Sequence, residues 1–364
     1  MILTTLYLHQ FRNYIDTKID FSDGVTLFVG KNGNGKTNIL EAIFLSILGK
    51  TFRGKKEHEM IAWEKPIAHV QARFIEQHVT QKREVVISST EKNKKLLKID
   101  EVLVKPIDYI GSIYCVLFSP EDMNLIDGEP SLRRRYLDVL LSQVDYQYAY
   151  SLAKYNKILK MRNKLLQSLR EGKAQHDELH FWDKHIIEYG QYVVDKRKIA
   201  LDFFNEKTSS LYQEMSDSET SLGIEYIGTT GKEYTETLKK RIHQDIAQGS
   251  TSVGPHRDDF QYILQGKDLR TFGSRGEYRS VILVLKMLEI LYIQDTKKTS
   301  PLLLLDDVFS ELDVARRSYL LGLVSDQQTI ITTTDIDNDL VKYMSTMNNA
   351  LLYEVHEGKV RLKS

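Results

Sequence analysis

The string Gly30-Lys31-Asn32-Gly33-Asn34-Gly35-Lys36-Thr37 restricts the fold of this chain more than any other sequence feature. It matches G-x-x-x-x-G-K-[ST], the P-loop pattern of a phosphate-binding turn. Glycines let the backbone turn so that its N–H groups face phosphate oxygens, while the lysine adds a positive charge. The string follows an apolar run, Val25–Val29, and precedes a helical pattern, Asn38–Leu48, which is the context that the motif requires. We therefore predict that the string and Asn38 contact a bound nucleotide.

An acidic pair supplies the second half of such a site. The apolar, strand-sized run Leu302–Leu305 ends at Asp306 and Asp307. A buried parallel strand delivers its last residue to the carboxyl edge of the sheet, where the phosphates would lie. We predict that Asp306 and the Thr37 hydroxyl hold Mg²⁺. We also predict that Asp307 and Lys36 are catalytic, Asp307 by orienting or deprotonating the attacking water.

The composition excludes several classes of protein. The chain has 364 residues, with 50 Lys and Arg balanced by 50 Asp and Glu. This balance excludes a protein that coats nucleic acid simply by being basic, although a local basic patch remains compatible with it. The single cysteine, Cys115, cannot form an internal disulfide, which is typical of a reducing, cytosolic compartment. No apolar run resembles a signal peptide or membrane span, so we expect a cytoplasmic protein.

Changes in periodicity divide the chain into three segments. Residues 1–125 have mostly strand patterns around the P-loop, residues 126–222 have helical patterns, and residues 223–364 return to mixed patterns. Apolar residues at spacings of three and four predict two long helices, one on each side of Gly172, that fold back as an antiparallel hairpin. We expect an α/β fold in which both chain ends build one ATPase domain, with a helical insertion domain between them.

Short segments of this layout are predicted from β-branched content, apolar runs and breaker residues. The expected strands are Ile2–Leu8, Val25–Val29, His69–Phe74, Glu84–Ser88, Leu96–Ile99, Pro301–Asp306 and Thr329–Thr333. A helix is expected over Tyr278–Ile293 and a final hairpin over Leu351–Leu362.

Further strings, in order along the chain, resemble ATP-binding-cassette (ABC) ATPases. Ser274-Arg275-Gly276-Glu277 resembles the S-x-G signature, and Ser310–Asp313 resembles a D-loop after the acidic pair. Asp306 lies 270 residues after Lys36, a long insertion that resembles the SMC-like branch rather than transporter cassettes. Four more strings look like the RecF family over residues 2 to about 335, namely Phe11–Tyr14, Phe118–Asp122, Gly254–Asp259 and Thr332–Asp335. The resemblance implies an ABC-type ATPase head, a P-loop NTPase fold.

The same resemblance implies a function. Members of this family act as ATP- and Mg²⁺-dependent homodimers that bind single- and double-stranded DNA and gap junctions. They work with RecR and RecO to promote RecA loading in gap repair, replication restart and SOS induction. Weak, DNA-stimulated ATPase activity and a cytoplasmic, nucleoid-associated location are also implied. The alternative is an ABC subunit that energises transport or SMC-like tethering, which the insertion length disfavours.

Individual residues follow from the resemblance as well. Arg12 and Asn13 would lie near the base and ribose, although Arg12 could instead be an exposed hairpin arginine. Ser274 and Gly276 would complete the γ-phosphate site of the opposite subunit, and Thr334 and Asp335 would occupy the switch position. The chain has Glu277 where glutamine is usual and Asp307 where many cassettes have glutamate, and no Q-loop residue is assigned. The string His256–Asp259 is either an internal ion-pair network that ties the two parts of the chain together or a direct contributor to DNA or nucleotide coupling.

Charge is unevenly distributed along the helical insertion. Residues 131–173 contain ten Lys and Arg against three Asp and Glu, whereas residues 174–240 contain eight against thirteen. The basic arm is a candidate phosphate-contacting face, and an ordinary solvated face is the alternative. The candidate DNA contacts are Arg53, Lys55, Lys56, Arg133, Arg134, Arg135, Lys154, Lys157 and Lys160, with Arg162 and Lys164 on the same arm.

Overall fold

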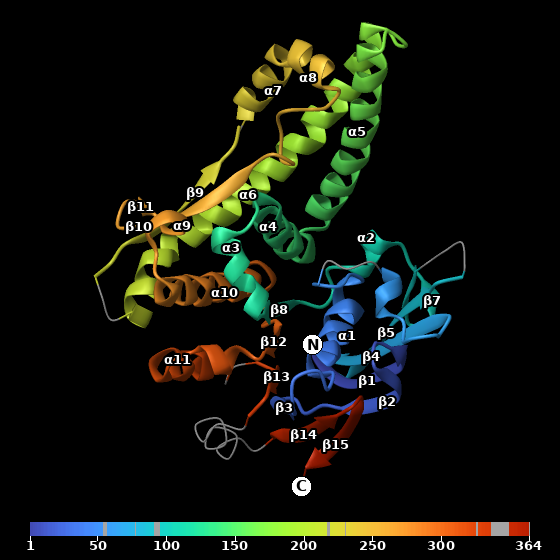
Figure 1. The fold of residues 1–364 in the computed structure, drawn as a ribbon, viewed down its shortest axis with the longest axis vertical. Coiled ribbons are helices and arrows are strands. Elements are labelled where there is room, and N and C mark those ends of the chain that lie inside the picture. The colour runs from blue at the N-terminus through green and yellow to red at the C-terminus, as the bar shows by residue number, and fades with distance from the viewer. Residues whose placement is uncertain are drawn as a thin grey trace. The chain divides into compact units, whose positions relative to one another are not determined.

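The computed structural model describes residues 1–53, 57–76, 78–90, 95–216, 219–229, 231–324, 327–335 and 349–363 (Figure 1). The chain divides into two compact units. The first unit consists of Met1–Asp122 together with Glu289–Ser364, and the second unit is Met123–Leu288. The expected ATPase domain built from both chain ends therefore corresponds to the first unit.

A six-stranded sheet in the first unit carries strands from both ends of the chain. Its order is β15-β14-β3-β13-β12-β8, and every neighbouring pair is parallel except β14 and β15. The strands are β3 (Val25–Val29), β8 (Cys115–Phe118), β12 (Leu302–Asp306), β13 (Thr329–Thr333), β14 (Leu351–His356) and β15 (Lys359–Lys363). All residues of β8, β12 and β13 are buried, as expected for parallel strands covered on both faces.

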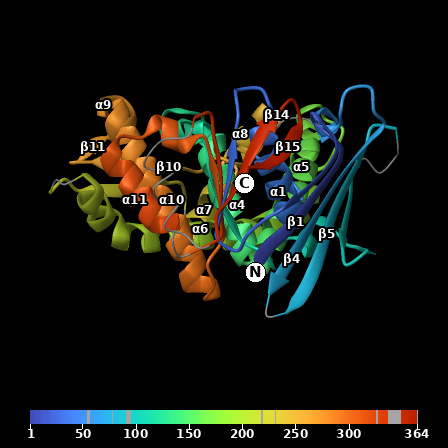
Figure 2. The same ribbon diagram turned by 90° about the horizontal axis from the view of Figure 1, so that it is seen from below.

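The second sheet of this unit is an antiparallel one with the order β2-β1-β4-β5-β6-β7. Its strands are β1 (Ile2–Phe11), β2 (Tyr14–Asp20), β4 (Ile67–Glu76), β5 (Val79–Ser88), β6 (Lys95–Ile99) and β7 (Val102–Leu103). Figure 2 shows β1, β4 and β5 side by side. Burial alternates along most of β4, so one face of this sheet covers the core and the other meets solvent.

Helix α1 (Lys36–Leu48) contacts strands of both sheets, namely β4 and β5 of one and β12 and β13 of the other. Every residue from Ile39 to Leu48 is buried, which is the pattern of a helix enclosed by core rather than lying on a surface. The helix ends at Gly49, whose left-handed φ of 65° lets its N–H bond the carbonyl of Leu45. The predicted helix and its glycine stop are both present.

Short helices and two longer ones complete the first unit. These are η1 (Glu57–Met60), α2 (Pro106–Tyr109), η2 (Pro120–Met123), η4 (Val308–Glu311), α11 (Val314–Val324) and the end of α10 (Arg275–Lys297), which begins in the second unit.

The second unit is built on the predicted helical hairpin, formed by α5 (Tyr146–Arg170) and α6 (Leu179–Ser216). Figure 1 shows these helices side by side, and Tyr155 and Ile158 of α5 share a core cluster with Ile186 of α6. The other elements are α3 (Asn124–Asp127), α4 (Pro130–Val144), η3 (His176–Glu178), β9 (Leu222–Ile227), α7 (Gly231–Lys240), α8 (Ile242–Gln248), β10 (Asp259–Leu264), β11 (Lys267–Asp268) and α9 (Leu269–Phe272).

The expected boundary after residue 222 differs from the division in the structure. Strand β9 pairs with β10 in an antiparallel sheet, and β9 also packs against α6. Residues 223–288 therefore join the helical unit, because the partners of their strands lie there. The return of strand patterns after Gly223 does not mark a return to the first unit.

The string His256–Asp259 is part of a polar network inside the second unit. Asp259 accepts two hydrogen bonds from Arg133, at 2.7 and 2.8 Å, and Asp258 accepts one from the Tyr226 hydroxyl. The carbonyl of Thr251 lies 3.0 Å from His256 Nε2 and can only accept, so that nitrogen carries the proton. The Tyr155 hydroxyl then donates to His256 Nδ1 at 2.6 Å. The geometry supports an internal network, but the expectation that it ties the two parts of the chain together is wrong, because all of these partners lie in the second unit.

Burial lowers the pKa of His256 to about 4. Because the unfolded chain takes up this proton near its ordinary pKa of 6.5 while the folded chain does not, acidification favours unfolding. We expect this group to cost about 3 kcal/mol of stability between about pH 7 and about pH 4. Urea unfolding at several pH values should show this loss in the unaltered chain but not in His256→Gln. His243→Gln, at an exposed histidine, is the control, and parallel curves for all three proteins would contradict the prediction.

Candidate nucleotide-binding site

The P-loop connects β3 to α1 at the carboxyl edge of the parallel sheet. Gly33 and Gly35 have φ values of 82° and 108°, in the left-handed region that other residues rarely adopt. Gly35 is the N-cap of α1, so the N–H groups of the first turn and the positive end of the helix dipole face the loop. This arrangement is a preformed anion site.

Lys36 is the principal cation at this loop. Its ammonium donates to the carbonyl oxygens of Gly30, at 2.5 Å, and Lys31, at 3.1 Å. Burial lowers the pKa of Lys36, and the charges of Asp307, Asp306 and Asp335 oppose that shift. One cation thus lies among three carboxylates, as in a site that assembles around a metal-bound phosphate.

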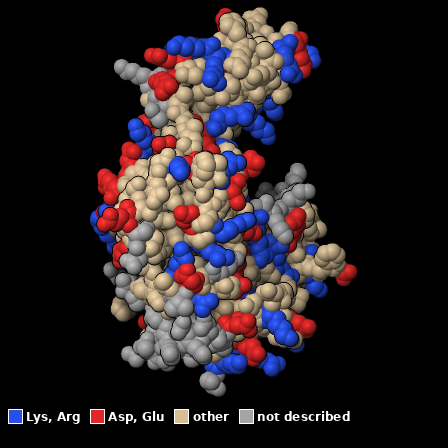
Figure 3. All heavy atoms as spheres, turned by 60° about the vertical axis from the view of Figure 1, so that its left-hand side comes forward, with Lys and Arg blue, Asp and Glu red and all other residues tan. Residues whose placement is uncertain are grey.

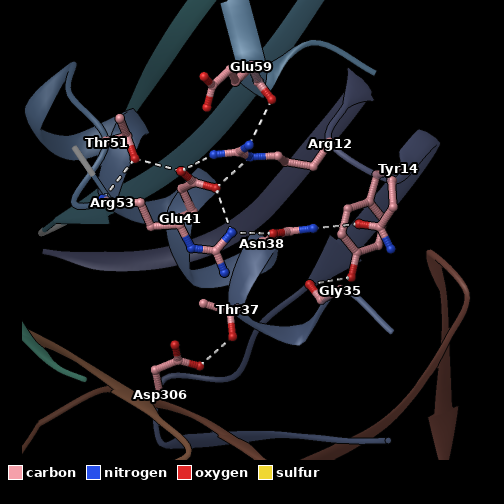
Figure 4. A network of polar contacts seen from close by, with 11 residues as sticks. Arg12, Tyr14, Gly35, Thr37, Asn38, Glu41, Thr51, Arg53, Glu59 and Asp306 are labelled. Atoms are coloured by element: carbon pink, nitrogen blue, oxygen red, sulfur yellow. Dashed lines mark hydrogen bonds and ion pairs between the residues drawn. The ribbon is translucent and has the colours of Figure 1, made fainter. Parts of the chain in front are cut away.

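Asp306 joins the two halves of the chain at this edge. Its Oδ1 accepts hydrogen bonds from the hydroxyls of Thr37 and Thr332, both at 2.8 Å (Figure 4 shows the bond to Thr37). Burial raises the pKa of the Asp306 carboxyl, an effect that these two hydroxyls oppose. A hydroxyl and a carboxylate already in contact are the hard oxygen ligands that Mg²⁺ prefers, so these residues fit the predicted metal.

Asp307 has two features typical of a functional residue. It has a φ of 53°, which is strained for a residue with a side chain. Its N–H donates to Thr332, at 3.0 Å to the carbonyl and 3.2 Å to the hydroxyl. Its Oδ1 is buried with no hydrogen-bond partner in the part of the chain that the structure describes. A carboxylate oxygen held in this way is available to a water or ligand.

Glu41 is a site residue that the sequence did not single out. It lies on α1 one turn after Thr37, with a side chain that is 0% exposed, and accepts from Arg12 at 2.8 and 2.7 Å (Figure 4). It also accepts from Thr51 at 2.6 Å and, at 3.4 Å, from Arg53. An acidic residue five places beyond the P-loop lysine was the available signal, but its two cationic partners lie in other segments.

These contacts change the interpretation of Arg12 and Arg53. Besides Glu41, Arg12 donates to the carbonyl of Glu59 at 2.7 Å, so it is not an exposed hairpin arginine. Arg53 donates to the Asn38 amide oxygen at 2.8 Å. Arg53 is therefore held by the P-loop helix, and its role as a DNA contact stays a prediction.

Asn13 lies against the P-loop, as expected. Its amide nitrogen donates to the Asn34 carbonyl at 2.9 Å, and its amide oxygen accepts from Asn38 at 2.8 Å. The neighbouring Tyr14 hydroxyl donates to the Gly35 carbonyl at 3.0 Å. The turn between β1 and β2 is thus fixed to both the loop and the first turn of α1.

The remaining predicted nucleotide contacts lie in two places. Thr334 and Asp335 follow β13, where the Asp335 carbonyl accepts from Thr333 at 2.9 Å. Ser274 is exposed in the second unit at the start of α10. Its hydroxyl accepts from the Glu277 N–H at 3.2 Å, while its own N–H donates to the Glu277 carboxylate at 2.6 Å. This reciprocal pair is a capping box, which explains why a glutamate stands at position 277. The Ser274 oxygen only accepts in this pair, so its O–H can still donate. Gly276 lies in the first turn of the same helix.

The predicted basic face is partly buried. Arg133 is only 2% exposed, and besides Asp259 it donates to main-chain carbonyls such as that of Gly128, at 2.9 Å. Arg162 is fully buried and forms ion pairs with Asp183 and Asp245. Both were wrongly predicted to face DNA, because periodicity on a helix does not reveal which cations have buried partners.

Other basic candidates keep their exposure. Arg135, Lys154, Lys157, Lys160 and Lys164 are exposed, and Arg134 is half-buried with its guanidinium donating to the Asp258 carbonyl at 2.8 Å. Lys55 and Lys56 lie outside the described residues. On the face drawn in Figure 3, Lys and Arg are interspersed with Asp and Glu.

None of the described helices is long and apolar enough to cross a membrane. Within the described ranges, no cluster of three or more His, Cys, Asp or Glu side chains could hold a metal ion. A metal at the P-loop would therefore depend on the Thr37–Asp306 pair and on the phosphates of the nucleotide.

Residues 2–357 match the family described as the RecF/RecN/SMC N-terminal domain. The chain belongs to this family. It is 37% identical over 99% of both chains to the DNA replication and repair protein RecF of Lachnoclostridium phytofermentans. It is 35% identical over the full length of both chains to RecF of Halalkalibacterium halodurans.

Solved structures give the same relationship. A structure of the recombination mediator protein RecF with ATP, in the RecFOR pathway, has a TM-score of 0.91 at 31% identity and covers 100% of this chain and 98% of its own. An SMC head domain from Pyrococcus furiosus has a TM-score of 0.57 at 16% identity, which shows a common fold. The RecF resemblance and the ABC-type ATPase head fold, both expected from sequence, are therefore confirmed.

Glu41→Gln tests the ion pairs that Glu41 forms with Arg12 and Arg53 beside the P-loop. The substitution keeps the shape of the side chain but removes the charge that pairs with Arg12 and Arg53. We expect a loss of about 3 kcal/mol in the free energy of unfolding, because two partly buried cations lose their carboxylate. Urea denaturation measures it. Glu59→Gln is the matched control, since Arg12 uses only the main-chain carbonyl of Glu59, and equal losses in both variants would refute the assignment.

Proposed function

We propose that this chain is an ATP-dependent, DNA-binding recombination mediator. The observation that carries the proposal is the Thr37–Asp306 hydrogen bond at the carboxyl edge of the parallel sheet, which joins a P-loop to an acidic strand end. Full-length similarity to proteins named RecF, including one whose structure contains ATP, supports the same conclusion. ATP is the proposed nucleotide, and Mg²⁺ the proposed metal.

Each residue of the P-loop region has a separate role in this proposal. The N–H groups of Gly33–Lys36 and the start of α1 bind phosphate oxygens, and the Lys36 ammonium exchanges loop carbonyls for the β- and γ-phosphates. Thr37 and Asp306 would hold Mg²⁺, which supplies charge neutralisation on the phosphates when bound. Asp307, with its buried free oxygen, orients or deprotonates the attacking water. Turnover is expected to be weak and DNA-stimulated.

Dimerisation completes this site in the proposal. The exposed Ser274 hydroxyl retains its proton for donation, and the N–H groups at the start of α10 add partial positive charge. A γ-phosphate held by one subunit is then the ligand for the Ser274–Gly276 surface of a second copy. ATP stabilises the closed dimer because it contacts both copies only in that state. DNA, RecR and RecO are the proposed partners, with RecA loading as the outcome, in the cytoplasm.

Sedimentation with and without ATP tests the dimer. The unaltered chain should become dimeric when ATP is added. Lys36→Ala should bind ATP at least tenfold more weakly and remain monomeric, because the ammonium proposed to bind the β- and γ-phosphates is lost. Ser274→Arg should bind ATP normally but remain monomeric, since the new side chain blocks the surface. Ser210→Arg, at an exposed serine of α6, is the control. The proposal would be contradicted if Lys36→Ala and Ser274→Arg each became dimeric when ATP is added.

Charge reversal tests the exposed part of the basic arm. Lys154→Glu, Lys157→Glu and Lys160→Glu together should weaken DNA binding and lower the salt slope of the binding constant by about 2 to 3, because each phosphate contact contributes about 0.9. Fluorescence anisotropy at several salt concentrations measures both quantities. The control reverses the exposed Lys239, Lys240 and Lys298 and should change affinity much less. An unchanged slope in the first variant would exclude these lysines as the DNA-contacting face.

A further inference from the structure

The P-loop is bound by two hairpins that come from distant parts of the sequence. Asn34 is the contact point of both. Its carbonyl accepts from the Asn13 amide, in the β1–β2 turn, at 2.9 Å and from the Gly358 N–H, in the β14–β15 turn, at 3.2 Å. Its own amide donates to the Val355 carbonyl of β14 at 3.0 Å. One residue at a variable position of the motif thus connects three segments.

Strand register explains why the second hairpin reaches the loop. β14 runs parallel to β3 with Leu351 opposite Thr26 and Glu354 opposite Val29, so Val355 comes next to Gly30 as the P-loop begins. Both strands end at the same edge of the sheet because they are parallel. The turn that follows β14 is therefore brought beside the phosphate-binding turn.

The approach is so close that a Cβ would clash at three glycines, with main-chain atoms at Gly30 and Gly358 and with a side chain at Gly35. A Cβ at Gly30 would lie 2.2 Å from the Val355 carbonyl oxygen, and one at Gly35 would lie 2.4 Å from the Asn13 amide nitrogen. In the β14–β15 turn, a Cβ at Gly358 would lie 2.3 Å from the Asn13 carbonyl oxygen, at a φ of 75°. Gly30 and Gly35 therefore allow the two hairpins, as well as the phosphates, to approach the loop closely. The β14–β15 turn contacts both Asn13 and Asn34.

We propose that Asn34 is a positioning residue that couples the P-loop to the β14–β15 hairpin, so that this hairpin responds to nucleotide binding. The inference rests on the proposed ATP binding and deepens it. Phosphate binding fixes the loop backbone on one side, and the hydrogen bonds of Asn34 transmit that ordering to the hairpin on the other. By reciprocity, a hairpin held in place pre-organises the loop and strengthens nucleotide binding.

Asn34→Ala removes the bond to Val355 and leaves the main chain unchanged. We expect ATP to bind about tenfold more weakly, the order of one net hydrogen bond. KM for ATP should rise while kcat at saturating ATP changes less than about twofold, because Asn34 positions the loop rather than reacting. Arg361→Ala is the control, at an exposed residue of the same hairpin opposite Glu354.

Hydrogen exchange provides a readout that a merely structural residue would not change. In the unaltered chain, ATP should slow exchange of the Gly358 amide, which donates to Asn34, and of neighbouring β14–β15 amides. This ATP-dependent protection should be reduced in Asn34→Ala, because the side-chain bond to the Val355 carbonyl is lost although the carbonyl of residue 34 still accepts from Gly358. Gly358→Val, which displaces the turn from Asn13, should weaken ATP binding to a similar extent, and the double variant should not be additive.

The possible outcomes separate the two proposals. If the unaltered chain binds ATP, but Asn34→Ala binds it equally well and the hairpin amides do not respond to ATP, the coupling is refuted while the proposed function stands. If the unaltered chain does not bind ATP at all, both are overturned. Weaker binding in Asn34→Ala and Gly358→Val, with ATP-dependent protection that is full in the unaltered chain and Arg361→Ala and smaller in Asn34→Ala, supports the coupling.

Discussion

The parallel alignment of β3, β12 and β13 is the constraint on which the rest of the site depends. Because these strands end at one edge of a sheet, the P-loop after β3, the carboxylates that end and follow β12 and the residues after β13 meet there. The Thr37–Asp306 bond spans 269 positions of sequence and exists only when this sheet has formed. A long insertion between the halves is compatible with this arrangement, since all strands of the sheet belong to the first unit and the entropy of closing a loop rises only slowly with its length.

Buried ionic groups add a second layer of organisation around the loop. Glu41 sits where an apolar residue of α1 would be expected, and it holds Arg12 and Arg53 at the first turns of the helix. Such a group contributes little net stability by comparison with a well-packed apolar residue, but removing one partner leaves the others uncompensated. The arrangement therefore fixes the geometry around the P-loop but adds little to the stability of the fold.

Sequence patterns predicted the local elements of this chain well and its long-range contacts poorly. The strands Val25–Val29 and Thr329–Thr333 have the predicted limits, because apolar runs bounded by breaker residues are local signals. The motif likewise indicated Lys36, Thr37 and Asp306 before any fold was known. Glu41 and the Asn34–Val355 bond were missed because their partners are remote in sequence. Assignment of residues 223–288 failed for the same reason, since pairing of β9 with β10 is not a local property.

The charge count of the basic arm changes meaning once burial is known. Of the ten cations between residues 131 and 173, Arg133 and Arg162 are buried in ion pairs and serve the interior of the second unit. The surface charge left to attract phosphate is smaller than the sequence indicates. A modest basic face binds a polyanion weakly as one copy and far more tightly as two, because the second contact becomes intramolecular. An ATP-dependent dimer would therefore make DNA binding conditional without a strongly basic chain, which agrees with its zero net charge.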